Sequence, residues 1–373
     1  MRYIVFVLLL GSITPLQSQN AQEFLDEIVD SFRIAYQVPG VAAAIVRPHS
    51  ILTTYSGVRN ANSREFLNAS CAFHLASNTK AITAMVAAHC VEREVIFWDT
   101  PFAQVLPELA DSIHPHFRDK TLQDFLSHRA GVAPFEDDRS EEWKGLPSYL
   151  ATLESPAVPF ALYALSLPPS NLTENGILYS NGGYAIAALM LESATGKAWE
   201  ELVKEFLGQV SIYPTFAYPA RKAPQQTHGH RAKGGGRLRS NPYRVVQPNE
   251  ADQLPAYLWP AGNLSCTLDE LTKLTQLQLI GLGGKDNILT TASYQKLHYG
   301  LDHYSLGWYN GTIGNTEERF SYHGGSLGSF SSAILLSPDR QAAVVILMNA
   351  DGKRANEMKE ELRKRLWRMY SQP

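Results

Sequence analysis

Apolar runs of strand length stand at both ends of the chain, and helical patterns lie between them. Near the amino terminus the strand patterns cover residues 41–46 and 51–55, and a third short apolar run covers 73–75. Near the carboxyl terminus four more follow, at residues 304–309, 319–322, 331–336 and 342–348. Strands at both ends predict a single sheet built from the two termini, with a helical region inserted between them.

Helical patterns flank and separate these strands. Amphipathic stripes predict helices at residues 21–36 and 356–370, and residues 77–95 form an alanine-rich stretch that is apolar enough to be a buried helix. The middle of the chain has shorter helical segments, at residues 122–126, 183–194 and 199–207, and a long polar loop at 222–250. We therefore predict an α/β sheet domain of residues 19–76 and 300–373 and a mainly helical region of residues 77–299, with the active site in the cleft between them.

The beginning of the chain predicts export. A basic start, Met1-Arg2, precedes an apolar stretch that is too short to span a bilayer, and Ser18 is a small residue at a suitable cleavage point. We expect residues 1–18 to be a signal peptide and the mature chain to be soluble, secreted or periplasmic. The formal net charge of -3 creates no field that would attract nucleic acid, and no later segment is apolar for long enough to span a membrane. The expected partner is a small-molecule or peptide substrate.

Three short motifs carry candidate chemistry, and the first is Ser77-Asn78-Thr79-Lys80 at the start of the predicted buried helix. Residues three apart share a helical face, so Lys80 can reach the Ser77 hydroxyl and take its proton. Burial lowers the pKa of a lysine and favours its neutral, basic form. The same spacing recurs at Ser293 and Lys296, but there it lies in a short polar stretch.

The second motif is Tyr179-Ser180-Asn181. A tyrosinate, or a tyrosine that shares its proton with Lys80, can act as general base on Ser77 and later protonate a leaving group. The Asn181 amide can orient both the lysine and a substrate carbonyl. Taken alone, the motif also fits a turn before a helix, with Asn181 as the N-cap and Tyr179 as a packing residue.

The third motif is His323-Gly324-Gly325-Ser326, at the end of a predicted strand. Glycines let the backbone approach a substrate, so the Ser326 amide is a candidate oxyanion donor together with the Ser77 amide. His323 would face the site as a cation or donor for a substrate carboxylate or leaving group. Alone, this motif also fits a tight turn with a surface histidine.

The three motifs, in this order, resemble the serine β-lactamase and penicillin-binding family, nearest to class C enzymes and their esterase and D-peptidase relatives. Further phrases that carry the resemblance are Phe73-His74-Leu75-Ala76, Leu126-Ser127-His128-Arg129-Ala130-Gly131, Gly182-Gly183-Tyr184 and Pro260-Ala261-Gly262. The resemblance implies an α/β domain made of both chain ends, an all-helical domain between them, and an acyl-enzyme mechanism. It implies Ser77 as nucleophile, Lys80 and Tyr179 as the acid/base pair, Asn181 as the orienting amide, and residues 323–326 as the substrate-binding strand end.

The chain departs from the family pattern at one position. Many β-lactamases have Lys-Thr-Gly where this chain has His323-Gly324-Gly325, so the fixed cation and hydroxyl that hold a β-lactam carboxylate are missing. The change resembles the histidine-bearing D-peptidases and esterases of the group. We therefore expect a D-amino-acid peptide, a small ester or a β-lactam as substrate, and inefficient hydrolysis where the substrate is a β-lactam.

Other interpretations of the sequence remain open. The segment 324–328 satisfies G-x-S-x-G, but no histidine follows it to complete the usual triad order. Two histidine pairs could suggest a zinc site, but no further zinc ligands follow either of them: His114-Pro115-His116 and His228-Gly229-His230. The three cysteines match no zinc pattern either. We therefore expect these histidines to lie in exposed loops, and we expect no metal or cofactor. A non-catalytic peptide-binding or self-assembling module of the same fold is the main alternative function.

Overall fold

The computed structural model describes residues 15–370 except 137–139, 154, 234–241 and 250–253. Its main feature is a six-stranded antiparallel sheet in the order β2-β1-β10-β9-β8-β7. The strands of this sheet are β1 (Gly40–Arg47), β2 (Ser50–Gly57), β7 (Tyr309–Thr312), β8 (Arg319–Ser326), β9 (Ser331–Ser337) and β10 (Ala342–Met348). The central pair joins the two ends of the chain, since β1 lies beside β10 with Val41 opposite Met348. The prediction of one sheet built from both termini is confirmed.

The remaining elements are mainly helical. The short strands are β3 (Ala72–His74), which pairs with β6 (Ser265–Thr267), and β4 (His230–Ala232), which lies between β5 (Tyr243–Val245) and β11 (Ala350–Asp351). The α-helices are α1 (Pro15–Tyr36), α2 (Thr79–Glu92), α3 (Phe102–Val105), α4 (Leu122–Leu126), α5 (Glu141–Lys144), α6 (Ala157–Ser166), α7 (Asn181–Thr195), α8 (Trp199–Gly208), α9 (Pro219–Lys222), α10 (Trp259–Gly262), α11 (Leu268–Leu282), α12 (Thr291–Tyr299) and α13 (Lys353–Tyr370). Short 3-10 turns are η1 (Ala76–Asn78), η2 (Pro107–Ser112), η3 (Pro115–Phe117), η4 (Ser148–Thr152) and η5 (Ala256–Leu258).

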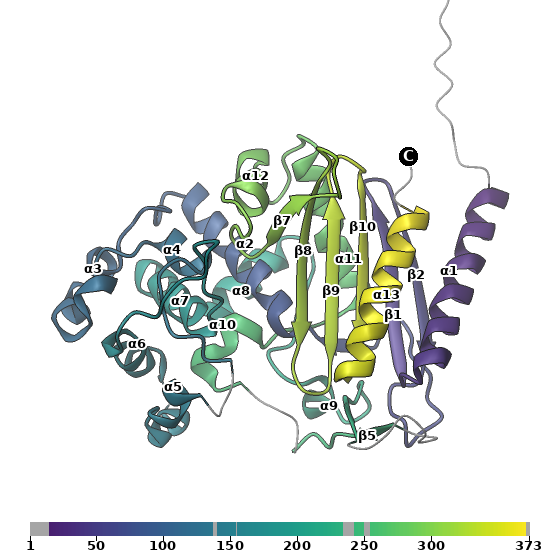
Figure 1. The fold of residues 1–373 in the computed structure, drawn as a ribbon, viewed down its shortest axis with the longest axis horizontal. Coiled ribbons are helices and arrows are strands. Elements are labelled where there is room, and N and C mark those ends of the chain that lie inside the picture. The colour runs from purple at the N-terminus through teal and green to yellow at the C-terminus, as the bar shows by residue number, and fades with distance from the viewer. Residues whose placement is uncertain (1–14, 137–139, 154, 234–241, 250–253, 371–373) are drawn as a thin grey trace, which may run out of the picture.

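Both faces of the central sheet are buried because β1 alternates its side chains between two hydrophobic clusters. Ala42, Ala44 and Val46 point to the cluster that contains α2 and α11. Val41 and its alternate neighbours point to the opposite cluster, with apolar side chains of α1 and α13. Figure 1 shows α13 crossing in front of the sheet with α1 at its edge. The first and last helices of the chain therefore cover one face together.

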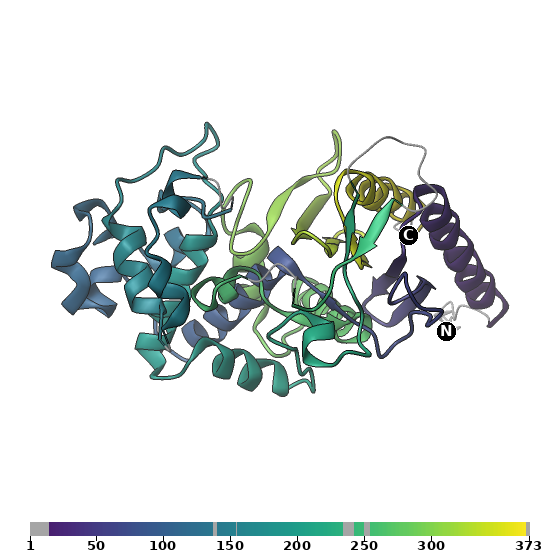
Figure 2. The ribbon, with the colours of Figure 1, turned by 90° about the horizontal axis from the view of Figure 1, so that it is seen from below.

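The helical part of the chain lies beside the sheet rather than on it. In both views α3, α4, α5, α6 and α7 gather at the opposite end of the molecule from α1 (Figures 1 and 2). Within residues 77–299, α11 packs against β1 and β10 of the sheet, and α12 contacts β7. Figure 1 shows α2 between these two parts, and Ser77 lies in the turn η1 directly before it.

Two predicted elements differ in the structure. Residues 304–308 of the predicted strand 304–309 do not form a strand: Ser305 N donates to Trp308 O at 2.8 Å, which makes a turn, and β7 begins only at Tyr309. Gly307 explains the turn, because its φ is +85° and a Cβ there would lie 2.8 Å from Ala81 Cα of α2. The predicted loop at 222–250 is also not wholly irregular, since it contributes β4 and β5.

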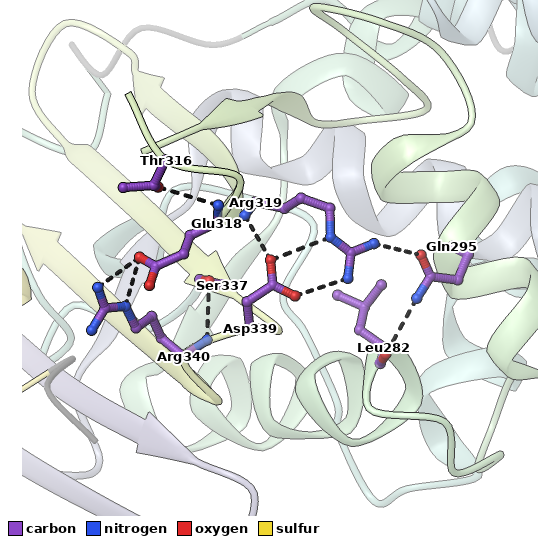
Figure 3. Close-up of polar contacts among 8 residues, drawn as sticks. All are labelled: Leu282, Gln295, Thr316, Glu318, Arg319, Ser337, Asp339 and Arg340. Atoms are coloured by element: carbon purple, nitrogen blue, oxygen red, sulfur yellow. Dashed lines mark hydrogen bonds and ion pairs between the residues drawn. The ribbon is translucent and has the colours of Figure 1, made fainter. Parts of the chain in front are cut away.

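Charged residues fasten the start of β8 to the turn between β9 and β10. Arg319 pairs with Asp339 at 3.0 Å, and Arg340 pairs with Glu318 at 2.6 Å. Arg319 also reaches Gln295 Oε1 of α12 at 3.5 Å (Figure 3). These contacts hold the strand that ends at residues 323–326 against its neighbours.

The predicted signal peptide mostly lies outside the described residues, which begin at Pro15 with α1. Among the helices of the described part, none is long and apolar enough to cross a membrane. Cys71, Cys90 and Cys266 are buried and unbonded to one another.

Candidate active site

Ser77 sits in the turn η1 that leads from β3 into α2, and buried hydrogen bonds fix this turn. Asn78 Nδ2 donates to Ser332 Oγ of β9 at 2.7 Å, and Ser332 Oγ donates to Leu75 O at 2.7 Å. Ala76 takes a left-handed conformation, with φ of +48°, which is uncommon for a residue with a Cβ. The backbone on both sides of Ser77 is therefore held in one geometry by the sheet.

Lys80 lies one helical turn after Ser77 and is fully buried. Its Nζ donates to Asn181 Oδ1 at 2.7 Å and to Ala261 O at 2.8 Å, and it is 3.3 Å from Ser77 Oγ. Burial lowers the pKa of Lys80 from 10.5 to about 7, while the negative charge of Glu136 acts in the opposite direction. A large fraction of this amine is neutral near pH 7, and a neutral amine can accept a proton from the serine.

Asn181 is the first residue of α7, and its side chain bridges two parts of the site. Its Oδ1 accepts from Lys80, and its Nδ2 donates to Phe135 O at 2.9 Å. The helix cap is Ser180, whose Oγ accepts from Gly183 N at 2.9 Å. The alternative that Asn181 is an N-cap is wrong, and its amide is available to orient the lysine.

Tyr179 forms a side-chain hydrogen bond with Ser77. Burial raises the pKa of Tyr179 well above its usual value, and a hydrogen bond with Ser77 opposes this only in part. Lys80 Nζ lies 4.7 Å from the centre of the Tyr179 ring. The phenol keeps its proton near neutral pH, so the tyrosinate considered from the sequence is disfavoured. Lys80 is the better proton acceptor, and Tyr179 is suited to donate.

His128 packs against Tyr179, a contact that the sequence did not predict. Its ring centre lies 4.4 Å from that of Tyr179, and its Nδ1 accepts from Ser180 N at 3.1 Å. Burial keeps the pKa of His128 well below the usual value, so the ring is neutral and Nδ1 remains an acceptor. The phrase Leu126-Ser127-His128 carried the family resemblance, but it gave no sign of this contact.

Of the two roles predicted for His323, cation or donor, the cationic one is disfavoured by its surroundings. Burial lowers its pKa to about 3, and the charge of Lys80 adds to the effect. Its Nδ1 is 2.9 Å from Gly324 O, which can only accept, so Nδ1 carries the proton and Nε2 accepts from Tyr304 Oη at 3.3 Å. Both ring nitrogens are therefore occupied, and His323 is a neutral, buried part of the strand end.

Gly325 and Ser326 lie next to the serine turn. A Cβ on Gly325 would be 2.2 Å from Leu75 O, so only glycine lets β8 approach η1 this closely. Ser326 is exposed, and its Oγ donates to Asp351 Oδ2 at 2.5 Å. Along β8, β7 pairs only with residues 319–322, so in the described chain the edge at 323–326 is covered by no strand on that side.

A cavity of about 430 Å³ joins the predicted elements. Ser77, Tyr179 and residues 323–326 line it, whereas Lys80 and Asn181 are not among its lining residues. Four further lining residues were not found from the sequence, namely Glu136, Tyr309, Tyr322 and Lys359. Tyr322 directly precedes His323 on β8, whereas Glu136, Tyr309 and Lys359 come from separate segments that no sequence motif joins.

The rival sites do not assemble. Ser326 stands at the end of β8 and is followed by β9 rather than by the helix that a nucleophile elbow requires. No group of three possible metal ligands occurs among the described residues. His230, expected in an exposed loop, is fully buried, and its two nitrogens contact Asn349 O and Ala61 N.

A family model described as Beta-lactamase matches residues 25–366. Unguisins hydrolase ungD of Aspergillus violaceofuscus is 24% identical over 190 residues, which cover 50% of this chain and 32% of that protein. Protein flp of Staphylococcus aureus is 21% identical over 355 residues, which cover 92% of this chain and 66% of that protein. The chain thus spans between about one third and two thirds of the length of these relatives.

A solved structure, the D-alanine carboxypeptidase AmpC from Burkholderia cenocepacia, superposes with a TM-score of 0.72 and 16% identity. The match covers 94% of this chain and 99% of that one. At this identity the match shows the fold, and the predicted β-lactamase/transpeptidase-like architecture is confirmed.

Proposed function

The chain belongs to the beta-lactamase family, and from that premise we propose that it is a serine hydrolase in which Ser77 attacks an amide or ester carbonyl. The observation that carries the proposal is the buried Lys80 amine, which lies 3.3 Å from Ser77 Oγ and has a pKa of about 7. A serine hydroxyl is a weak nucleophile until a neighbouring base removes its proton. This pair supplies that base at neutral pH.

The proposed reaction has two halves. Lys80 takes the Ser77 proton as Oγ bonds to the carbonyl carbon, and Tyr179 gives its proton to the departing amine or alkoxide. The products of this half are an acyl-enzyme and a free amine or alcohol. Water then attacks the ester of Ser77 and gives a proton to Tyr179, while Lys80 returns its proton to the Ser77 oxygen as the carboxylic acid departs. Asn181 and Ala261 O hold the lysine in place through both halves.

The oxyanion of each tetrahedral intermediate needs preorganised donors, and we propose the backbone amides of Ser77 and Ser326. The close approach of Gly325 to Leu75 supports this pairing, because it brings the end of β8 against the serine turn. The uncovered edge of β8 at residues 323–326 offers backbone groups to an extended substrate.

We further propose a D-amino-acid peptide or a small ester as substrate and inefficient β-lactam hydrolysis. His323 is neutral and both its nitrogens are bonded, so the strand end has no cation in the position where many β-lactamases carry lysine. A solved relative described as a D-alanine carboxypeptidase makes D-alanyl peptides the first peptides to test. We also propose that residues 1–18 are a signal peptide that directs export. The active site, in this proposal, lies in a cleft between residues 77–299 and the sheet domain.

The test is a hydrolysis panel of p-nitrophenyl esters, D-alanyl peptides and nitrocefin, run on the purified chain from Gln19 and on Ser77→Ala. We expect turnover of an ester or a D-alanyl peptide that is lost in Ser77→Ala and kept in the control Ser293→Ala. A folded wild-type chain that turns over no member of the panel would favour a non-catalytic peptide-binding module.

A further inference from the structure

The last helix, α13, brings a buried lysine to the cavity that contains Ser77. The Lys359 side chain lines this cavity, although the residue is only 6% exposed. Its Nζ donates to Gly325 O at 3.3 Å. Burying an ammonium group is costly unless it is paired, so its position in this wall calls for a compensating interaction.

The nearest carboxylates are engaged with other groups. Burial lowers the pKa of Lys359, and the charges of Asp351 and Glu360 oppose that effect from nearby. Asp351 accepts from Ser326 Oγ at 2.5 Å and from Gly352 N at 2.7 Å. Glu360 pairs with Arg363 at 2.6 Å.

In the described part of the chain, Lys359 forms no ion pair and its ammonium makes the single hydrogen bond to Gly325 O. An ammonium has three N–H donors. Two of them remain for a group that enters the cavity.

The cavity is lined by one carboxylate, from Glu136, and one ammonium group, from Lys359. Glu136 belongs to the segment before α5, and its charge acts on Lys80 and Tyr179. Lys359 stands at the strand end, beside Gly325. His323 is neutral. The strand side of the cavity therefore presents one cation, and that cation comes from α13 rather than from β8.

We propose that Lys359 is a specificity-determining residue that binds a carboxylate of the substrate, so that the hydrolase prefers carboxylate-bearing esters and amides. The inference rests on the proposed function and adds the class of substrate. A charge-assisted hydrogen bond between Lys359 and the carboxylate would stabilise the bound substrate, and no proton or covalent bond changes at this residue.

The test uses two pairs of esters that differ by one charge. One pair is mono-p-nitrophenyl glutarate and its methyl ester, and the other is 4-acetoxybenzoate and its methyl ester. The first pair places the carboxylate on the acyl side, and the second places it on the leaving group. In Lys359→Met we expect kcat/KM for the acid of at least one pair to fall by about 10- to 100-fold, mainly through KM, with its neutral twin nearly unchanged. Lys359→Arg should restore part of the loss.

The matched control is Lys364→Met, since Lys364 is on the same helix, is exposed and pairs with Glu361 at 3.0 Å. It should leave both pairs unchanged. If Lys359→Met does not fold, as judged by circular dichroism, Lys359→Gln takes its place.

Equal effects on acid and neutral esters in both pairs would overturn the inference and leave the hydrolase proposal intact. Failure of the folded wild-type chain to turn over any ester, D-alanyl peptide or nitrocefin would instead overturn the hydrolase proposal, and the inference with it.

Discussion

At the scale of single residues, the environment of Lys80 determines how the site responds to pH. The neutral amine is the form that accepts the Ser77 proton, and the pKa of Lys80 is about 7. We therefore expect kcat/KM to rise with pH through about 7, because protonated Lys80 cannot act as a base. The acidic limb of a pH–rate profile measures this pKa.

Glu136 provides a second test of the same group. Its charge raises the pKa of Lys80 against the larger effect of burial, so Glu136→Gln should move the acidic limb to lower pH. Glu108→Gln is the control, since Glu108 is exposed and is not one of the charges that act on Lys80. A limb that stays in place, or moves to higher pH, would contradict the assignment of this pKa to Lys80.

Removal of either proton-transfer group should be severe. We expect Lys80→Ala and Tyr179→Phe each to lower kcat by roughly 100-fold or more, with the fold retained. Lys296→Ala is the control, because it has the same spacing from a serine but lies in α12. The change is measured by steady-state kinetics on one p-nitrophenyl ester. Full activity in Tyr179→Phe would show that another group protonates the leaving group.

The sequence predicts only part of the site at this scale. Ser77 and Lys80 could be found because one helical turn joins them, and short motifs pointed to Tyr179. The sequence could not predict that Ala261 O, Glu136 and Lys359 belong to the site, since each reaches it through a tertiary contact. The neutral state of His323 was also beyond the sequence, because it follows from burial and from the hydrogen bond to Tyr304.

At the scale of elements, the contact between β8 and η1 builds the proposed oxyanion site. Gly325→Ala places a methyl group 2.2 Å from the backbone oxygen of Leu75, which cannot move without shifting Ser77. Gly324→Ala meets only the hydroxyl end of Tyr322, at 2.7 Å, and this side chain can rotate. We expect Gly325→Ala to lower kcat by about 10-fold or more and Gly324→Ala to keep most of it. Equal activity of the two variants would argue against the contact.

Strand and helix patterns predicted these elements well where the pattern was local. The first and last residues of α4 and β10 are those of the predicted segments. The pattern of apolar residues that predicts each element lies wholly within that element. Residues 304–308 were wrongly assigned to a strand for a tertiary reason. The chain must turn at Gly307 to pass α2, and an apolar run does not encode that neighbour.

At the scale of the whole molecule, the fold depends on α13 closing one face of the sheet. Leu362 is fully buried in the cluster shared by α1, α13 and the sheet. We expect Leu362→Ala to lower the free energy of unfolding by roughly 2–5 kcal/mol, as for other buried leucines. Lys364→Ala, an exposed position on the same helix, should change it by about 0.5 kcal/mol or less. Denaturant unfolding monitored by circular dichroism measures both, and similar values would mean that α13 is not a structural part of the fold.

The same architecture explains why three distant motifs can form one site. The serine turn, the start of α7 and the end of β8 are far apart in sequence, and the sheet built from both chain ends places them around one cavity. The order of the motifs and the resemblance predicted this arrangement. The carboxylate and the lysine that charge the cavity walls were found only in the folded chain.

The most direct test of the account is to map covalent modification of the folded chain by a fluorophosphonate, which loses fluoride as it bonds to an activated serine oxygen. Digestion and mass spectrometry then locate the adduct. We predict one adduct on Ser77, formed much more slowly in Lys80→Ala. An adduct on Ser326 instead, or a folded chain that stays unmodified, would contradict the proposal that Ser77 is the nucleophile.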